Sequence, residues 1–327
     1  MIQLTFETSG TTGEPKGITH SLDAMIANAE AFNKAVGLNS STRMYHCLPK
    51  THMSGFLNTI LCPTIAGGTV VFGPTFSAKT AAGFWASLLD NEANTVWITP
   101  TIAATLLRME RCGPGVTHKY GVRLEHVFCG TAPLPRKIRE QWFDTYNVPL
   151  QESYGTSELM LVSVQGYEEA EAGEHNVGSL LPGIEVSGNP GELVVSSLYS
   201  KQGAHTGDIG EYKDGRLTIT GRIKDLIIRG GFNVSPVRVE EALRKIDGVS
   251  DAAVVGQPDE FWGEKIIAFL EGGHEVMAVG IATNFAGSYQ QNLPKSHWPD
   301  VIHIVDKLPR NEMGKVIKGE LKSRLAV

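Results

Sequence analysis

The chain has 327 residues, of which 42% are hydrophobic and 20% are charged, and its net charge at pH 7 is −6. This length allows a substantial buried core and predicts two domains. The small negative charge provides no broad basic field, which argues against a nucleic-acid partner, and no stretch is long and apolar enough to span a bilayer.

The cysteines and histidines indicate which cellular compartment and which metal sites to expect. The four cysteines show no Cys-x-x-Cys spacing and lie among apolar residues, which is typical of reduced, buried thiols. The first residues lack the basic and apolar regions of a secretory signal, so we expect a cytoplasmic protein. The ten histidines form no His-Glu-x-x-His pattern, so the sequence indicates no zinc site.

A run rich in glycine and hydroxyl side chains follows a short strand-like segment at residues 4–7. Residues 8–17 read Thr-Ser-Gly-Thr-Thr-Gly-Glu-Pro-Lys-Gly. Glycines let the backbone bend sharply and approach a ligand, while hydroxyls and a lysine supply donors for phosphate oxygens. The spacing is neither that of a Walker A loop nor that of a Gly-x-Gly-x-x-Gly fingerprint. We interpret the run as a mobile phosphate clamp, with a plain surface turn as the alternative.

Apolar strands alternate with amphipathic helical stretches through the first half of the chain. A helix is expected at residues 21–36, where Ser21 is a suitable N-cap and Gly37 a suitable stop. The further predicted elements are strands at 69–72, 95–98 and 125–129 and helices at 79–90 and 135–146. This alternation favours parallel strands in an α/β domain, whose ligands bind beyond the carboxyl ends of the strands.

The pattern changes after residue 177. Short strands punctuated by glycine at 191–195 and 215–219 predict a small antiparallel or β-barrel-like section. A βαββαβ-like unit is expected after Asp225, and its predicted elements are a helix at 236–246, a strand at 252–255 and a helix at 276–291. The predicted fold class is α/β, with a large domain of mostly parallel sheet layers, the small β-barrel-like section, and a smaller, mobile C-terminal α+β domain.

Five further motifs follow the phosphate clamp in order. They are Gly-Thr-Ala-Pro-Leu at 130–134, Tyr-Gly-Thr-Ser-Glu at 154–158, Thr-Gly-Asp at 206–208, Gly-Arg-Ile-Lys-Asp at 221–225 with Gly-Gly-Phe-Asn at 230–233, and Leu-Pro-Arg-Asn-Glu-Met-Gly-Lys-Val at 308–316. With the clamp, these runs resemble the motifs of the adenylate-forming superfamily, which comprises acyl- and aryl-CoA ligases, peptide-synthetase adenylation domains and luciferases. The resemblance extends from about residue 4 to the last helix.

The resemblance implies a reaction in two halves. A carboxylate attacks the α-phosphorus of ATP, which releases pyrophosphate and leaves an acyl-adenylate, and a thiol then displaces AMP. The first half brings two anions together, so positive charge and oriented donors must offset their repulsion. The implied function is an acid–thiol ligase that uses ATP, Mg²⁺ and CoA on a small carboxylic acid. Two alternatives remain: loading of a carrier-protein phosphopantetheine, and a non-catalytic AMP-binding regulatory protein.

The resemblance also implies roles for individual residues. The implied catalytic residues are Thr11, Lys16, Glu158 and Lys315. Glu158 and Thr12 would hold Mg²⁺, which prefers oxygen ligands, and Lys315 would bridge the carboxylate and the α-phosphate. The implied nucleotide- and cofactor-binding residues are Thr8, Ser9, Gly10, Thr12, Gly13, Gly130, Thr131, Ala132, Tyr154, Gly155, Thr156, Asp208, Arg222, Gly230 and Gly231.

Each of these roles has a plainer alternative. Glu158 could lie in the first turn of a helix, where the dipole favours an acid, and Asp208 could be an ordinary turn residue. Tyr154 could stack on adenine or pack in the core. Arg222 could serve the nucleotide or form a structural salt bridge, and Lys315 could be a solvated lysine before a C-terminal helix.

The resemblance places a hinge at Asp225. It divides the chain into a large AMP-binding domain, residues 1–224, and a C-terminal lid domain, residues 225–327. The lid would rotate between the two half-reactions, withdrawing Lys315 and bringing the glycine loop at 230–231 to the site. The alternative for this loop is an ordinary turn between two strands.

The acid-binding pocket is the least defined part. Residues 49–55 resemble the Pro-x-x-His-x-x-Gly stretch of acyl- and aryl-CoA ligases. They contain no aspartate of the kind that pairs with an α-ammonium group, which disfavours an amino-acid substrate. The expected pocket residues are His52, Trp97, Thr131 and Gly155, although His52 is equally compatible with a structural role.

Members of the superfamily carry a sizeable segment before the phosphate clamp, which this sequence lacks. Apolar surface that such a segment normally covers would stay open, and open apolar patches usually mark an interface. We therefore expect a homodimer or a complex with another subunit.

Overall fold

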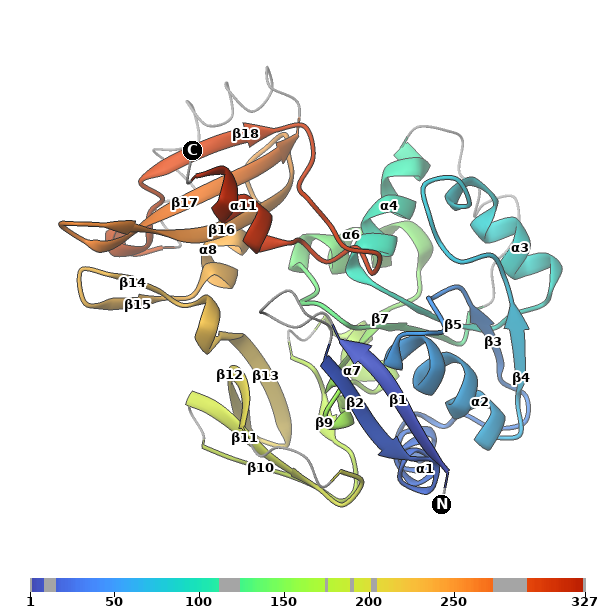
Figure 1. Cartoon of the computed structure of the whole chain (residues 1–327). Helices are drawn as coiled ribbons and strands as arrows, with labels where there is room; N and C mark the ends of the chain where they lie inside the picture. Colours follow the sequence, from blue (N-terminus) through green and yellow to red (C-terminus); the bar gives the residue numbers. More distant parts are fainter. Residues whose placement is uncertain are drawn as a thin grey trace. The chain divides into compact units, whose positions relative to one another are not determined.

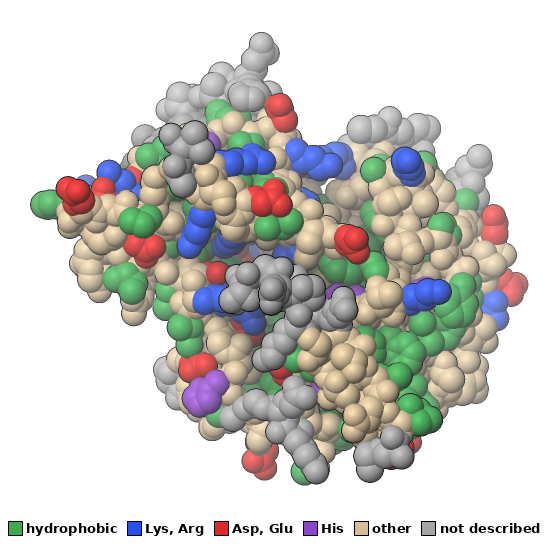
Figure 2. Space-filling model, in the orientation of Figure 1, with side chains coloured by type: hydrophobic (Ala, Val, Ile, Leu, Met, Phe, Trp, Pro, Cys, Tyr) green, Lys and Arg blue, Asp and Glu red, His purple; other side chains and the backbone are tan. Residues whose placement is uncertain are grey.

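The computed structural model forms two compact units, Met1–Thr206 with Glu211–Thr218, and Gly207–Gly210 with Ile219–Val327. The structure describes residues 2–8, 16–111, 124–173, 176–188, 191–200, 205–272 and 293–325. Among these residues, no helix combines the length and the apolar character that crossing a bilayer would require. On the face shown in Figure 2, acidic and basic side chains are interspersed.

A seven-stranded sheet forms the centre of the first unit, in the order β4-β3-β5-β6-β7-β8-β9 (Figure 1). Its strands are β3 (Arg43–His46), β4 (Thr69–Phe72), β5 (Thr95–Ile98), β6 (His126–Cys129), β7 (Leu150–Thr156), β8 (Met160–Val164) and β9 (Ser179–Leu180). The pairs from β4 to β7 are parallel, whereas β8 and β9 are antiparallel. The strands predicted at 69–72 and 95–98 are confirmed, and the one predicted at 125–129 begins at His126.

The helices of this unit are α1 (Leu22–Val36), the π-helix η1 (Ser54–Leu61), α2 (Cys62–Ile65), the 3-10 turn η2 (Ala81–Gly83), α3 (Phe84–Asp90), α4 (Pro100–Arg111), α6 (Arg136–Tyr146) and α7 (Tyr167–Glu171). Helix α1 begins and ends as predicted. Ser21 Oγ accepts from the Ala24 amide, and Gly37 adopts a left-handed φ of 79° as the C-cap. The stretch predicted as one helix at 79–90 is η2 followed by α3, and η1 was not foreseen.

An antiparallel hairpin, β1 (Gln3–Thr8) and β2 (Lys16–Ser21), precedes α1. A four-stranded sheet has the order β10-β11-β12-β13 and comprises β10 (Ile184–Ser187), β11 (Gly191–Ser197), β12 (His205–Lys213) and β13 (Arg216–Arg222). Strands β10 and β11 pair antiparallel. The glycine-punctuated strands predicted at 191–195 and 215–219 fall in β11 and β13.

The second unit contains a five-stranded sheet in which β15-β14-β17-β16 are adjacent and β18 pairs parallel with β17. Its elements are η3 (Ile223–Asp225), β14 (Ile227–Arg229), β15 (Phe232–Val234), α8 (Pro236–Leu243), β16 (Val249–Asp259), β17 (Gly263–Gly272), η4 (Lys295–His297), β18 (Val301–Val305) and α11 (Lys318–Arg324). A hairpin, β14–β15, therefore precedes the helix where the βαββαβ-like prediction has a single strand. The helix predicted at 276–291 lies outside the described residues.

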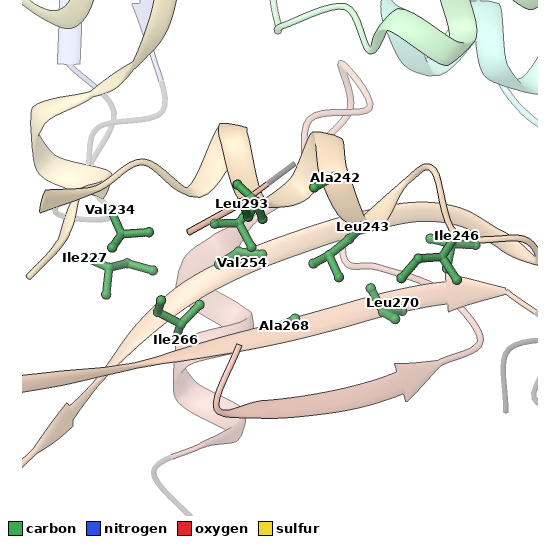
Figure 3. Packing of buried hydrophobic residues seen from close by; sticks show 13 residues of the cluster. Ile227, Val234, Ala242, Leu243, Ile246, Val254, Ile266, Ala268, Leu270 and Leu293 are labelled. Atoms are coloured by element: carbon green, nitrogen blue, oxygen red, sulfur yellow. The ribbon is translucent and has the colours of Figure 1, made fainter. Parts of the chain in front are cut away.

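Strands β16 and β17 are covered on both faces, which explains their continuous apolar runs. Figure 3 shows Leu243 of α8 facing Val254 and Leu270, with the other residues of this cluster around them. The alternate residues, such as Val255 and Phe269, pack on the opposite face with Leu308 and with Leu321 of α11. Successive side chains of a strand point to opposite faces, so each strand needs apolar residues at every position where both faces are covered.

Candidate active site

The predicted phosphate clamp connects β1 and β2. Residues Ser9, Gly10, Thr11, Thr12 and Gly13 lie outside the described residues. The hairpin register pairs Thr8 with Lys16, so the two ends of the clamp are adjacent. The described part of the clamp is therefore limited to its two ends, which the hairpin brings together.

Glu158 lies in the turn between β7 and β8. Thr156 pairs with Met160 across this turn, and Thr156 Oγ1 accepts from the Leu159 amide at 3.2 Å. Ser200 Oγ donates to the Glu158 carbonyl oxygen at 2.6 Å. The alternative that Glu158 begins a helix is therefore wrong, because a hairpin turn presents it.

Glu158 is half-buried, and no described residue forms a hydrogen bond or ion pair with its carboxylate. Within the part of the chain that the structure describes, no group of three or more His, Cys, Asp or Glu side chains forms a ready cation site. A single uncommitted carboxylate fits Mg²⁺ bound with a nucleotide, since that ion keeps several waters and takes one or two carboxylates plus phosphate oxygens. Thr12, the second predicted ligand, lies outside the described residues.

Close packing restricts the loop after β6. A Cβ on Gly130 would lie 2.8 Å from Ser153 Oγ, so only glycine fits without displacement. Thr131 is exposed and has a φ of 74°, an unusual conformation for a β-branched residue that surrounding structure must impose. Ala132 follows it, half-buried, and Leu134 then donates its amide to Glu152 Oε1 at 3.2 Å.

A buried ion pair holds this loop on β7. Arg139 of α6 contacts the Glu152 carboxylate through Nη2 and donates through Nη1 to Gln165 Oε1 at 3.0 Å. The Glu152 amide donates to the same Gln165 oxygen at 2.9 Å. Sequence reasoning missed this network. The sequence carries no clear signal of it, because Glu152 stands between two polar residues, Gln151 and Ser153, and nothing local reveals the arginine that pairs with it.

Strand β7 ends in Tyr154, Gly155 and Thr156. The pairing with β8 shifts register between Tyr154 and Gly155, and a Cβ on Gly155 would lie 2.2 Å from the Met160 carbonyl oxygen. Only glycine fits there, which brings the backbone of β7 close to β8. Tyr154 is half-buried and Gly155 is exposed, so this strand end remains open to a ligand.

The predicted acid-pocket residues lie in different settings. His52 Nδ1 is 2.8 Å from Ser54 Oγ at the start of the π-helix, and burial lowers the pKa of His52. π-Helical turns are frequent at functional sites. A Cβ on Gly55 would lie 2.0 Å from the Pro49 carbonyl oxygen, which explains the glycine of this motif.

Trp97 is fully buried in β5 and contacts the rings of Phe32 and Phe128 at centroid distances of 5.3 and 5.0 Å. Among the described residues its Nε1 has no hydrogen-bond partner. This nitrogen lies 3.5 Å from the position that a Cβ of Gly130 would take, beside Ser153. The sheet thus brings Trp97, Gly130 and Ser153 together at the carboxyl ends of three neighbouring strands.

Asp208 and Arg222 form a pair in the second unit. Asp208 is 5% exposed, and its Oδ1 accepts from Arg222 Nε at 2.5 Å. The structural salt bridge considered for Arg222 is therefore present. An ordinary exposed turn aspartate does not fit Asp208, because this carboxylate is buried and paired.

Lys315 follows a tight turn that is fixed to the sheet. Its amide donates to Asn311 Oδ1 at 2.9 Å, and Gly314 adopts a φ of 78°. Arg310 donates to the Gly314 carbonyl oxygen at 3.0 Å and pairs with Asp251 of β16 at 2.5 Å. These contacts anchor the turn at both ends.

The charges around Lys315 come from the Thr-Gly-Asp motif and the predicted hinge. The side chain keeps contact with solvent, yet the surrounding protein partly desolvates it and lowers its pKa. Arg222 and Lys224 lower the pKa further, whereas Asp225 and Asp208 oppose this shift. Charged residues from three separate segments, at positions 208, 222–225 and 315, therefore gather in one place.

Gly230 and Gly231 form the turn of the β14–β15 hairpin, with φ values of 56° and 81°. Two successive left-handed residues are what a two-residue hairpin turn requires. The Gly230 amide also donates to the Trp262 carbonyl oxygen at 2.8 Å. The turn between two strands is thus present, and a role in thiol transfer stays a prediction.

Two family models match the chain. The model of the AMP-binding enzyme matches residues 5–196, and that of the AMP-binding enzyme C-terminal domain matches residues 238–315. The first match covers more than half of the chain, so the chain belongs to the AMP-binding enzyme family. The resemblance to the adenylate-forming superfamily is confirmed.

Individual relatives agree with this family. The chain is 30% identical to the probable CoA ligase CCL8 of Humulus lupulus and 29% identical to the mitochondrial malonate–CoA ligase ACSF3 of Mus musculus, in each case over 98% of its own length. It spans 61% and 64% of those two proteins. ATP-bound MatB from Rhodopseudomonas palustris has a similar structure, with a TM-score of 0.84 at 26% identity over 98% of this chain and 67% of that one.

Proposed function

We propose that the chain acts as an ATP-dependent acid–thiol ligase, which activates a carboxylic acid as an acyl-adenylate and transfers the acyl group to CoA. The observation that carries this proposal is the charged cluster of the second unit, where Lys315 lies in the electrostatic field of Asp208 and Arg222. A carboxylate can accept hydrogen bonds from both ribose hydroxyls, and an ammonium group can stabilise negative charge on the α-phosphate. The cluster can therefore bind two adjacent parts of one nucleotide. The CoA ligase names of the relatives support CoA as the acceptor.

The remaining roles follow from the chemistry of each group. The clamp, with Thr11 and Lys16, binds the β- and γ-phosphates, and Glu158 with Thr12 holds Mg²⁺. Mg²⁺ neutralises phosphate charge when it is bound. Lys315 then stabilises the charge that develops as the carboxylate attacks. The lid rotation about Asp225, the homodimer and the cytoplasmic location stay predictions.

ATP–pyrophosphate exchange across a panel of carboxylic acids tests this proposal. We expect exchange that depends on one class of acid, because the acid itself is the nucleophile of the first half-reaction. Malonate belongs in the panel because one relative is a malonate–CoA ligase, and fatty and aryl acids should accompany it. A protein that binds ATP but exchanges pyrophosphate with none of them would favour the regulatory alternative.

A second experiment compares CoA with a carrier protein as the acceptor of the acyl group. We expect thioester formation with CoA to exceed that with a phosphopantetheinylated carrier protein when both are supplied at the same concentration. Preference for the carrier would favour the second function, loading of a carrier protein, without affecting the first half-reaction.

The pH dependence of adenylation offers a further test. Lys315 acts as a cation, and its pKa lies below the ordinary value of 10.5. As the pH rises through this lowered pKa the charge is lost, so the adenylation rate should fall at a lower pH than an unperturbed lysine would allow. Lys315→Arg keeps its charge throughout and should lack this alkaline limb. The measurement is kcat/KM for exchange against pH, and an identical limb in both proteins would contradict the role of Lys315.

A further inference from the structure

The turn that carries Glu158 is held on both sides by the segment that follows the phosphate clamp. Before Glu158, His20 Nε2 lies 2.7 Å from the Ser157 carbonyl oxygen. After it, Asn28 Nδ2 donates to the Leu161 carbonyl oxygen at 2.9 Å, and Asn28 Oδ1 accepts from the Leu161 amide at 3.1 Å. His20 is 5% exposed and Asn28 is fully buried. Glu158 therefore lies between two fixed points.

The hydrogen bond of His20 has a defined direction. A carbonyl oxygen can only accept, so Nε2 of His20 carries the proton. His20 belongs to β2, which begins at Lys16 of the clamp. The contact therefore joins the strand that leaves the clamp to the turn of Glu158, across 137 positions of sequence. Such a bond is strong where water is excluded, and it restricts the separation of the two elements.

The turn depends on contacts of this kind. Met160 adopts a left-handed φ of 63°, which is unfavourable for a residue with a side chain. Conformations of this type persist only where neighbouring structure over-determines them. His20 of β2 and Asn28 of α1 hold the turn through their hydrogen bonds to Ser157 and Leu161. Ser200 holds it through its hydrogen bond to the Glu158 carbonyl oxygen.

We infer that His20 is a positioning residue, which fixes the turn of Glu158 on β2 so that the Glu158 carboxylate is held in place to bind the magnesium ion of MgATP. The inference rests on the proposed function, because it takes Glu158 as the magnesium ligand. His20 itself binds neither the metal nor the nucleotide. It acts through the Ser157 carbonyl group, next to Glu158 in the chain.

The variants His20→Ala and His20→Gln test this inference by calorimetric titration with MgATP and, separately, with ATP in the presence of a chelator. His20→Ala should weaken MgATP binding by about 10- to 100-fold, as is usual when a group that orients a metal ligand is removed. Binding of metal-free ATP should change little, because in the proposed function Glu158 contacts the nucleotide only through the metal. His20→Gln should recover most of the affinity, since its amide can donate to the same carbonyl group.

Asn33→Ala is the matched control. Asn33 is also buried, and its Nδ2 donates to the Cys62 carbonyl oxygen at 2.8 Å, away from the Glu158 turn. This variant should lower the melting temperature without changing MgATP affinity. If His20→Ala behaves in the same way, with lower stability and unchanged MgATP affinity, His20 has a structural role alone and the inference is overturned.

Calorimetry also separates this inference from the proposed function, because it requires no turnover. A native protein that binds MgATP but catalyses no exchange would contradict the proposed function alone, and the comparison of the variants would still decide the role of His20. A native protein that binds no MgATP would contradict both.

Discussion

Replacing Lys315 by alanine is expected to lower the rate of ATP–pyrophosphate exchange by on the order of a hundredfold or more, the usual effect of removing one group that stabilises transition-state charge. The two reacting groups are both anions, so the loss of a cation between them raises the barrier directly. The turn at Asn311–Gly314 holds the backbone of Lys315, which lies near Asp208.

Two comparisons make this prediction specific to the first half-reaction. Lys315→Ala should still convert a supplied acyl-adenylate and CoA to the thioester at close to the native rate, because no phosphorus is attacked in that step. Lys322→Ala, which changes an exposed lysine of α11, should leave exchange intact. Near-native exchange in Lys315→Ala would show that another group supplies the charge.

Replacing Arg139 by methionine is expected to lower the free energy of unfolding by about 3–5 kcal/mol, because it leaves a buried carboxylate without its partner. The side chains of Arg139 and Glu152 are only 4% and 7% exposed. Denaturant unfolding measures this change. The Arg139→Met variant should also bind nucleotide more weakly, because Glu152 accepts a hydrogen bond from the Leu134 amide in the loop after β6.

Helix α6 provides the control for this prediction. Arg136 pairs with Glu140 on the same helix at 2.8 Å, but the side chains are 66% and 59% exposed. Arg136→Met should change stability by less than about 1 kcal/mol, because water screens exposed ion pairs. Equal effects of the Arg136 and Arg139 variants would contradict the account of the buried network.

The sequence predicted those elements whose signals are local. The strand at 95–98 is a nearly continuous apolar run because all four of its residues are buried, as in a parallel sheet covered on both faces. The strand at 69–72 has the β-branched and aromatic residues that favour strands, although it lies at the edge of the sheet and is partly exposed. The helix at 21–36 was bounded by its own caps, Ser21 and Gly37. The order of the motifs predicted the family, since each motif is short and contiguous.

Features that depend on contacts between distant segments were not predictable in this way. The π-helix η1 has the composition of an ordinary buried helix, so periodicity alone could not identify it. Glu152 lies between the polar residues Gln151 and Ser153, so its burial and its pairing with Arg139 became evident only in the folded structure. His20 gave no signal either, because its importance lies in a contact with Ser157.

Isotope transfer from the acid tests the central claim, an acyl-adenylate intermediate, most directly. The carboxylic acid is labelled with ¹⁸O in both oxygens and incubated with the protein, MgATP and CoA, and the products are analysed by mass spectrometry. Attack on the α-phosphorus, followed by cleavage of the acyl carbon–oxygen bond by the thiol, predicts one labelled oxygen atom in AMP. Label in inorganic phosphate with formation of ADP, or unlabelled AMP, would contradict this account.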